Sequence, residues 1–120
     1  MTAMSADGLV SRLFQIVDGR SWDELGTLFT EDARYERPGY EPLKGIDRIR
    51  HFYIHERIIA AGSVHLVDHI TSSLGAAACW GRLRGAALNG EPLNEEFADT
   101  YVIRDGRIAH RKTFFYRPAI

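Results

Sequence analysis

The chain has 120 residues, enough for one domain with one core, and hydrophobic and charged residues make up 45% and 26% of it, as in ordinary globular proteins. A formal charge of -1, with no basic tract interleaved with aromatic residues, argues against a nucleic-acid partner. The one cysteine, Cys79, excludes an intrachain disulfide and any multi-cysteine metal site.

The start of the chain has neither the basic nor the apolar region of a signal peptide, and no apolar run approaches the ~20 residues of a membrane span. The five histidines do not follow the spacing of a metal ligand set. We therefore expect a single domain over residues 1–120 in a reducing, cytoplasmic setting, with no membrane contact and no metal.

Two helices are predicted first. Ser5 can cap a helix whose apolar residues recur at helical spacing as far as the break at residues 18–20. Ser21 and Glu24 have the spacing of a capping box, which predicts a second, short helix ending near residues 30–32. The second helix is expected to bury Trp22, Leu25, Leu28 and Phe29.

A short strand over residues 33–37 should follow, stopped by Pro38. A third helix is predicted from residue 46 to residue 61, ended by Gly62. Glu56 stands on its apolar stripe, and we expect it to pair with an arginine one turn away.

The remaining chain predicts four strands, over residues 63–72, 76–88, 93–104 and 107–116. Asn89-Gly90 and Asp105-Gly106 are typical hairpin turns, so these strands should form an antiparallel meander. Three helices cannot cover both faces of such a sheet. The order therefore predicts an α+β fold in which a strongly curved sheet closes over the helices as a cone with a pocket inside.

The third long strand places a carboxylate on its more apolar face. Period 2 aligns Asp99 with Phe97, Tyr101 and Ile103. A carboxylate there is costly unless it is hydrogen-bonded, neutral or at a pocket wall, which makes Asp99 a candidate acid or base. The alternative is a structural aspartate bonded to the backbone or to a tyrosine hydroxyl.

This order of elements resembles the nuclear transport factor 2-like superfamily, which has a cystatin-like cone, and in particular its SnoaL-like polyketide cyclase and ketosteroid isomerase-like branch. The resemblance spans about residues 8–118 and lies in the segments 18–25, 28–33, 45–53, 78–80 and 101–108. It is specific for the fold but not for the reaction, because this superfamily includes isomerases, dehydratases, cyclases, epoxide hydrolases and non-catalytic binders.

The resemblance implies that Asp99 points into the cone, either as a neutral acid, as in the isomerases, or as a general acid/base, as in the cyclases. Two isomerase groups are absent, because Arg37 stands where the isomerases have their base and Leu13 where they have their oxyanion tyrosine. The strand with Arg82 and Arg84 lacks the carboxylate that an epoxide hydrolase of this superfamily needs.

Dehydratases of the superfamily have a histidine at a place comparable to His65, which makes it the expected partner of Asp99; the alternative is that His65 and His69 simply face solvent. The expected catalytic residues are thus Asp99 and His65. The residues expected to bind substrate are Tyr35, Tyr53, Trp80, Phe97, Tyr101 and Phe115. One bulge in the last strand would exchange His110, Lys112 and Phe114 with Arg111, Thr113 and Phe115, so its phase stays open.

The sequence thus favours a cofactor-free enzyme that acts by acid/base chemistry on an apolar, oxygenated small molecule, through cyclisation, isomerisation or dehydration. The alternative is a non-catalytic domain of the same fold that binds a hydrophobic ligand or only dimerises. A homodimer through the outward face of the last strand, with Phe114 and Tyr116, is compatible with both. The substrate and the exact reaction are not determined by the sequence.

Overall fold

The computed structural model describes residues 5–120, so the first four residues of the segment without signal-peptide features lie outside the described part. Its elements are, in chain order, α1 (Ala6–Gly19), the 3-10 helix η1 (Trp22–Thr27), β1 (Phe29–Glu36), β2 (Leu43–Lys44), α2 (Ile46–His51), the π-helix η2 (Phe52–Glu56), β3 (Val64–Ser73), β4 (Ala76–Ala86), β5 (Pro92–Arg104) and β6 (Arg107–Phe115).

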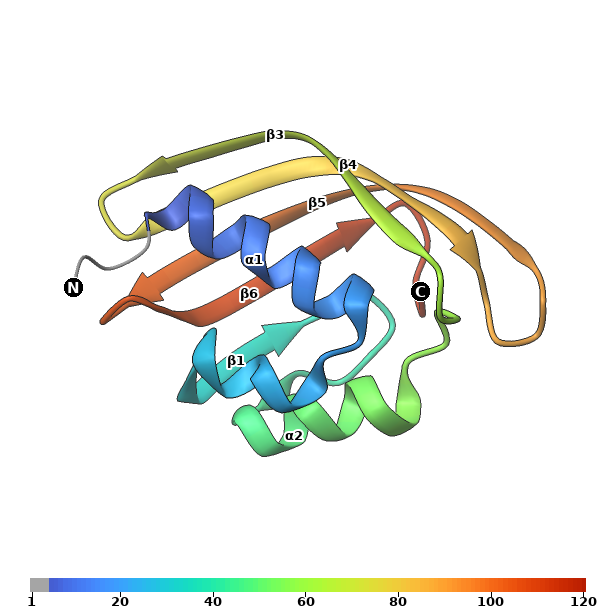
Figure 1. Ribbon diagram of the computed structural model, residues 1–120, viewed down its shortest axis with the longest axis horizontal. Helices are drawn as coiled ribbons and strands as arrows, with labels where there is room; N and C mark the ends of the chain where they lie inside the picture. The colour runs from blue at the N-terminus through green and yellow to red at the C-terminus, as the bar shows by residue number, and fades with distance from the viewer. Residues whose placement is uncertain (1–4) are drawn as a thin grey trace.

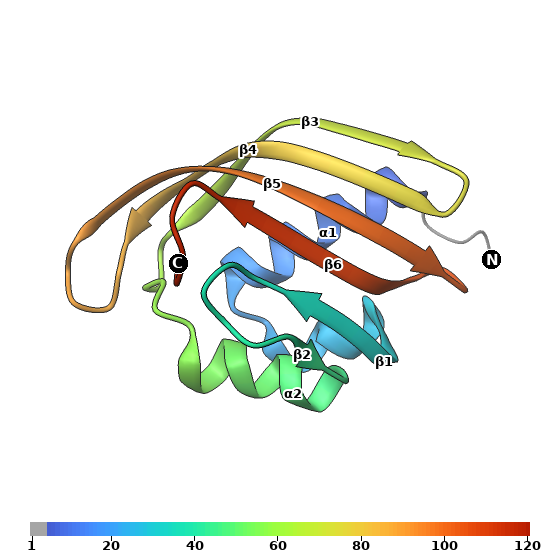
Figure 2. The same ribbon diagram turned by 180° about the vertical axis from the view of Figure 1, so that it is seen from behind.

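All strands belong to one sheet, in the order β2-β1-β6-β5-β4-β3. The strands β3 to β6 form the predicted antiparallel meander, whereas β1 pairs with β6 in parallel. The sheet curves over α1, and the short helices lie below α1 beside β1 (Figures 1 and 2). The predicted α+β architecture, with helices packed inside a strongly curved and mostly antiparallel sheet, is confirmed.

The first helix forms as its sequence predicts. Ser5 is the N-cap, and its hydroxyl accepts a hydrogen bond from the amide of Gly8 at 3.1 Å. The helix ends at Arg20, whose backbone is left-handed with φ of 57°. Its buried face supplies a third of a central core: Leu9, Val10, Leu13, Phe14, Ile16 and Val17.

The prediction of a capping box at residues 21–24 was wrong. The Ser21 side chain makes no capping hydrogen bond, and the Glu24 carboxylate instead accepts a hydrogen bond from Arg12 at 3.0 Å. The short helix is 3-10 and ends at Thr27, and β1 begins with Phe29, earlier than expected. The Glu24 side chain thus bonds to the neighbouring helix α1 and does not cap its own helix.

The third helix is also shorter than predicted. Its last turn widens into the π-helix η2, and the backbone of Arg57 is already extended, with φ of -65° and ψ of 130°. The following segment pairs with the chain after β4: the amide of Ala60 donates to the carbonyl of Ala86 at 2.8 Å. Glu56 bonds to Arg48, two turns away and not one, at 2.5 and 3.0 Å.

A bulge in β3 separates two histidines that were expected on one face. The register shifts between Val67 and His69, so that His65 faces the interior and His69 lies exposed on the outside. The phase of β6 is settled as well, because Arg111 and Thr113 are buried while Lys112 and Phe114 are exposed. None of the helices in the described part is long and apolar enough to cross a membrane.

Candidate active site

The carboxylate of Asp99 lies inside the cone and is completely buried. Its Oδ2 accepts hydrogen bonds from the Tyr101 hydroxyl at 2.6 Å and from Nε and Nη2 of Arg111 at 3.1 and 2.9 Å. Its Oδ1 accepts one from the hydroxyl of Thr113 at 2.5 Å. The sheet positions these groups, because Asp99 is opposite Thr113 and Tyr101 is opposite Arg111 on the paired strands β5 and β6.

Arg111 connects this carboxylate to a second polar group. Its Nη1 donates to the hydroxyl of Tyr53 at 2.7 Å, and its guanidinium lies over the rings of Tyr35 and Phe14, at 4.6 and 5.6 Å from their centroids. Burial is the largest influence on the Arg111 guanidinium and lowers its pKa, but the Asp99 carboxylate together with Tyr35, Tyr53 and Tyr101 outweighs burial and raises it. The guanidinium is therefore a fixed cation that holds both Asp99 and Tyr53.

The direction of each hydrogen bond shows which hydroxyl does not donate its proton to another protein group. Thr113 donates to Asp99, so it accepts from Tyr35 at 3.1 Å, and the Tyr35 oxygen in turn accepts from Nη1 of Arg37 at 2.5 Å. Tyr53 only accepts, from Arg111, and no group among residues 5–120 accepts its proton. Tyr53 can therefore donate to a ligand, whereas Tyr35 is already engaged.

Burial raises the pKa of Tyr53 to about 12 in spite of the opposing effect of Arg111, so this hydroxyl keeps its proton at neutral pH. Burial acts in the same direction on Tyr35, but the positive charges of Arg111 and Arg37 outweigh it and lower its pKa. The two phenol rings stack with their centroids 6.2 Å apart. Both hydroxyls thus lie near guanidiniums, but these positive charges outweigh burial only at Tyr35.

His65 is held by a carboxylate that the sequence did not indicate. Oδ1 of Asp18 lies 2.6 Å from Nδ1 of His65, and Oδ2 accepts a hydrogen bond from the His65 amide at 2.9 Å. The ring lies between Phe14 and Phe97, at centroid distances of 4.8 and 5.4 Å, and its side chain is 5% exposed. A carboxylate only accepts, so Nδ1 has the proton and Nε2 presents a lone pair.

Burial lowers the pKa of His65, although Asp18 acts in the opposite direction. The imidazole is therefore neutral at pH 7 and has the orientation and tautomer of a general base. Asp18 was read in the sequence only as part of a helix break. The signal for its role is spatial, since α1 ends beside the start of β3, 47 residues along the chain.

The structure gathers most of the predicted site residues in the interior. Phe14 contacts both His65 and Arg111, and so joins the histidine to the network that contains Asp99, Tyr35, Tyr53 and Tyr101. Phe97 packs on His65, and the partly buried Phe115 lies near Arg37, farther along the cone. Sequence reasoning missed Asp18 and left Arg111 and Thr113 undecided.

Trp80 is the exception, and its expected place in the interior pocket was wrong. On β4, Cys79 is paired with Asp99 and faces inward, so the next residue, Trp80, faces outward. It is 46% exposed and stacks on His69 at 4.8 Å. Trp80 instead lines an outer groove of about 400 Å³, whose other lining residues include Phe97, Phe114, Phe115 and Tyr116.

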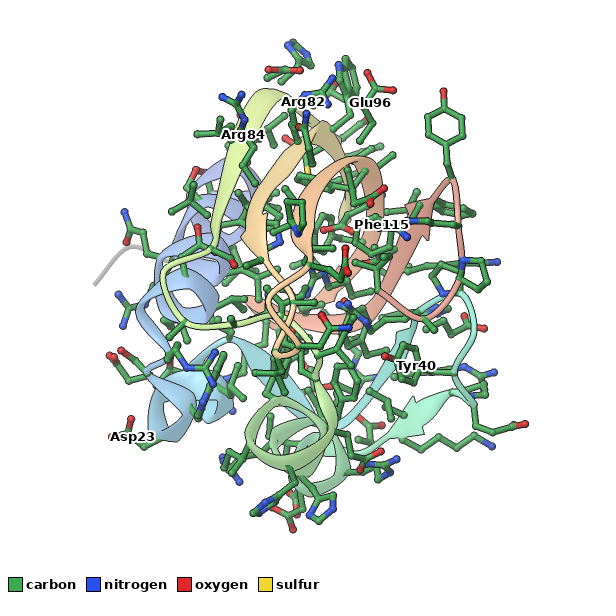
Figure 3. All side chains as sticks on the ribbon, turned by 90° about the vertical axis from the view of Figure 1, so that its right-hand side faces the viewer. Asp23, Tyr40, Arg82, Arg84, Glu96 and Phe115 are labelled. Carbon is green, nitrogen blue, oxygen red and sulfur yellow. The ribbon has the colours of Figure 1, made fainter. Side chains whose placement is uncertain are left out.

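A second cleft is lined by Thr30, Glu31, Asp32, Arg104, Asp105 and Arg107, and neither cleft borders the carboxylate of Asp99 or the ring of His65. Figure 3 looks toward the end of the cone, with Phe115 and Tyr40 within it and Arg82 and Glu96 on its outer side. Among residues 5–120, no three His, Cys, Asp or Glu side chains are placed to hold a metal ion.

Comparisons with known proteins agree with this architecture. A search of curated proteins by sequence gave no match. Among solved structures, an NTF2-like protein of unknown function from Burkholderia pseudomallei is similar with a TM-score of 0.83 and 20% identity, over 93% of this chain and 92% of the other. A candidate SnoaL-like polyketide cyclase from Jannaschia sp. CCS1 is similar with a TM-score of 0.81 and 17% identity, over 97% and 92%.

An LEH-like epoxide hydrolase from M. tuberculosis is similar with a TM-score of 0.75 and 16% identity, over 89% of this chain and 79% of the other. At such identities these structures establish the fold, which hosts several activities. The sequence itself matches the model of the SnoaL-like domain family over residues 10–111. The chain therefore belongs to the SnoaL-like domain family.

Proposed function

We propose that the protein is a cofactor-free enzyme that transfers protons on an apolar, oxygenated small molecule, in a cyclisation, isomerisation or dehydration. The observation that carries this proposal is the pair formed by the partly exposed Asp18 and the nearly buried ring of His65, with a separation of 2.6 Å. A histidine fixed in this way beside Phe14 and Phe97 suits proton abstraction from carbon better than it suits a purely structural role.

In this proposal His65 is the general base. Its Nε2 takes a proton from the carbon next to a carbonyl group, and the Asp18 carboxylate stabilises the imidazolium that results. The proton then returns to another carbon in an isomerisation, or leaves with a hydroxyl group in a dehydration. General acid/base catalysis of this kind accelerates a reaction by about 10²–10⁴-fold.

Tyr53 stabilises the oxyanion that forms when the proton leaves. In this proposal its proton is donated to the substrate oxygen, and Arg111, which donates to the same hydroxyl, strengthens that hydrogen bond. Tyr101 and Thr113 complete the support, because both donate to the carboxylate that pairs with Arg111. The rings of Phe97 and Phe115 supply apolar surface for the rest of the substrate.

This proposal gives Asp99 a different role from the acid/base function expected from the sequence. Its four hydrogen bonds are all donated to it, and its oxygens therefore act as acceptors. A neutral, proton-donating carboxyl of the isomerase type needs an apolar site, whereas Asp99 faces a guanidinium. Asp99 is accordingly a positioning residue that holds Arg111 and, through it, Tyr53.

Proton exchange with solvent tests the enzyme proposal without knowledge of the natural substrate. A series of cyclic ketones, enones and polyketide-like β-diketones is incubated with the protein in D₂O, and deuterium entry next to the carbonyl is followed by NMR. We expect exchange on at least one compound, reduced by about 10²-fold or more in the His65→Gln variant. Equal exchange by the wild type, His65→Gln and a His69→Gln control would contradict the proposal.

A second candidate is a non-catalytic binding or dimerisation domain. It is favoured by the complete bonding of Asp99 and by the position of both clefts away from His65. Such a domain shows ligand-dependent stabilisation but no exchange. For either function we also propose a homodimer through the outer face of the sheet. The exposed apolar side chains of that face are Trp80, Val102, Phe114 and Tyr116. Sedimentation should show a dimer for the wild type and a monomer for the Phe114→Glu variant.

A further inference from the structure

The interior of the cone has more buried positive than negative groups. Arg37, Arg57 and Arg111 are 6%, 7% and 2% exposed, whereas Asp99 is the buried carboxylate among residues 5–120. That carboxylate forms an ion pair with Arg111, whose Nη2 lies 2.9 Å from Oδ2 of Asp99. Asp18, at the edge, is bonded to His65. Among residues 5–120, two buried guanidiniums, of Arg37 and Arg57, are therefore left without a side-chain carboxylate of their own, which is costly unless another anion joins them.

Arg57 is the less satisfied of the two. It follows the π-helix at the point where the chain becomes extended, and its guanidinium lies 5.5 Å from the centroid of the Tyr53 ring. Its Nε has no hydrogen-bond partner in the described part of the chain, and no carboxylate is among the groups that act most strongly on its charge. Burial lowers the pKa of Arg57 to about 10, and the positive charge of Arg37 acts in the same direction. It is still a cation at neutral pH.

Arg37 lies over the ring of Tyr35, which stacks on the ring of Tyr53. Its guanidinium is within 5.1–6.0 Å of the ring centroids of four aromatic residues, Tyr35, Tyr40, Phe52 and Phe115. Its Nη1 bonds to the Tyr35 hydroxyl, but its Nε has no partner. Aromatic faces stabilise such a cation in part, and they leave its hydrogen-bonding edge available to an anion.

At the end of the described chain, this edge of Arg37 already donates to an oxygen. Nη2 of Arg37 donates to the carbonyl oxygen of Ile120, and the preceding amide, of Ala119, donates to the carbonyl of Pro38 at 2.8 Å. The Ile120 side chain is 3% exposed and packs in an apolar cluster. The other members of this cluster are Ile59, Leu83, Ala87 and Leu93, with Ile58 and Phe115 at its border. Ile120 thus places an acceptor oxygen on Arg37 and an apolar side chain in the adjacent cluster.

We propose that Arg37 and Arg57 bind the acidic group of an anionic ligand, a carboxylate on an aromatic or alicyclic body, which replaces Ile120 in its contacts with Arg37 and the apolar cluster. The proposal rests on the proposed function only in treating this ligand as the substrate, and it adds the chemical class of that substrate. The carboxylate would satisfy the unpaired guanidinium, while the apolar body takes the place of the Ile120 side chain in the apolar cluster.

Arg57 gives the sharper test, because its Nε has no hydrogen-bond partner among residues 5–120, whereas Nη1 of Arg37 donates to the Tyr35 hydroxyl. We would measure by isothermal titration calorimetry the binding of 2-naphthoate and of its neutral analogue 2-naphthamide, with 1-naphthoate, benzoate and cyclohexanecarboxylate as further carboxylates. The proteins compared are the wild type, Arg57→Met, Arg57→Lys and the charge-matched control Arg84→Gln, on the exposed side of β4.

We expect the wild type to bind at least one carboxylate about tenfold or more tightly than its amide, as hydrogen bonds to a charged group predict. Arg57→Met should lose that preference, Arg57→Lys should keep most of it, and Arg84→Gln should equal the wild type. Equal affinities for acid and amide, no binding of any carboxylate, or an unchanged preference in Arg57→Met would each overturn the proposal.

The two proposals fail in different ways. The calorimetric probes do not react, so their binding does not depend on His65, and the His65→Gln variant should keep the preference for the acid. Loss of deuterium exchange with intact, Arg57-dependent binding of carboxylates would overturn the enzyme and leave an anion-binding domain. Exchange on neutral ketones with no preference for acids would overturn the anion site and leave the enzyme.

Discussion

The guanidinium of Arg111 and the carboxylate of Asp99 face each other from the neighbouring strands β6 and β5, 2.9 Å apart and both almost fully buried. The pair stands at the centre of the interior, because one partner also holds Tyr53 and the other accepts hydrogen bonds from Tyr101 and Thr113. A buried ion pair of this kind contributes little net stability, but the loss of one partner leaves the other charge uncompensated.

Replacement of Asp99 by asparagine should therefore destabilise the protein. The change keeps the shape of the side chain but leaves Arg111 as an unpaired buried cation, and we expect a loss of about 3–5 kcal/mol in the free energy of unfolding. Urea denaturation measures it. The double variant Asp99→Asn/Arg111→Met should recover much of the loss, because it removes the stranded charge. A double variant as unstable as the sum of the single variants would show that the pair does not act as a unit.

Tyr53→Phe separates the role of its hydroxyl from that of its ring. The stacking on Trp22 and Tyr35 remains, at 4.9 and 6.2 Å, while the donor proposed for the oxyanion is lost. We expect deuterium exchange to fall by about 10²-fold, as for loss of one oxyanion donor. The matched control is Tyr35→Phe, which removes a hydroxyl bonded to Thr113 and should impair exchange less. The reverse order of effects would contradict the role given to Tyr53.

Because the pKa of His65 is lowered, we predict that the free energy of unfolding depends on pH. Because burial holds the folded-state pKa of His65 below its ordinary value of 6.5, the unfolded chain binds this proton first as the solution is acidified. The contribution of neutral His65 is present above pH 6.5 and is lost as pH falls toward the folded-state pKa. Denaturation at pH 7, 6 and 5 should show this loss in the wild type but not in His65→Gln. Identical profiles would mean that His65 does not titrate differently on folding.

Arg57→Met should stabilise the free protein. Methionine keeps an unbranched apolar side chain beside Tyr53 and removes a buried charge that has no carboxylate partner, so we expect a gain of about 1 kcal/mol or more in the free energy of unfolding. Thermal denaturation of Arg57→Met measures the gain, with the exposed Arg84→Met as the control for charge. A clear loss of stability would show that the guanidinium is well satisfied in the folded protein.

The sequence predicted those features that depend on local pattern. Alternation along residues 93–104 placed Asp99 correctly between Phe97 and Tyr101, and the Asp105-Gly106 turn located the hairpin that follows. Features that depend on register were not predictable in this way. One bulge turned His69 outward, and the phase of β6 decided that Arg111 and not Lys112 reached Asp99.

Contacts between distant segments were also beyond the sequence argument. In the sequence, Asp18 was interpreted as part of a helix break. Its hydrogen bond to His65 forms because α1 ends beside β3. Arg57 was expected within a helix, where it would have faced a neighbouring turn, but the early end of η2 leaves it buried. The resemblance to SnoaL-like proteins supplied the cone, which local pattern alone permitted but did not require.

The proposed role of His65 as the base requires one protonation state of its ring, and nitrogen NMR of the ¹⁵N-labelled protein at pH 7 measures that state directly. We predict a neutral imidazole with its proton on Nδ1, bonded to Asp18, and an unprotonated Nε2 that can accept a proton from a substrate. A proton on Nε2, in either the other tautomer or the imidazolium, would contradict His65 as the base.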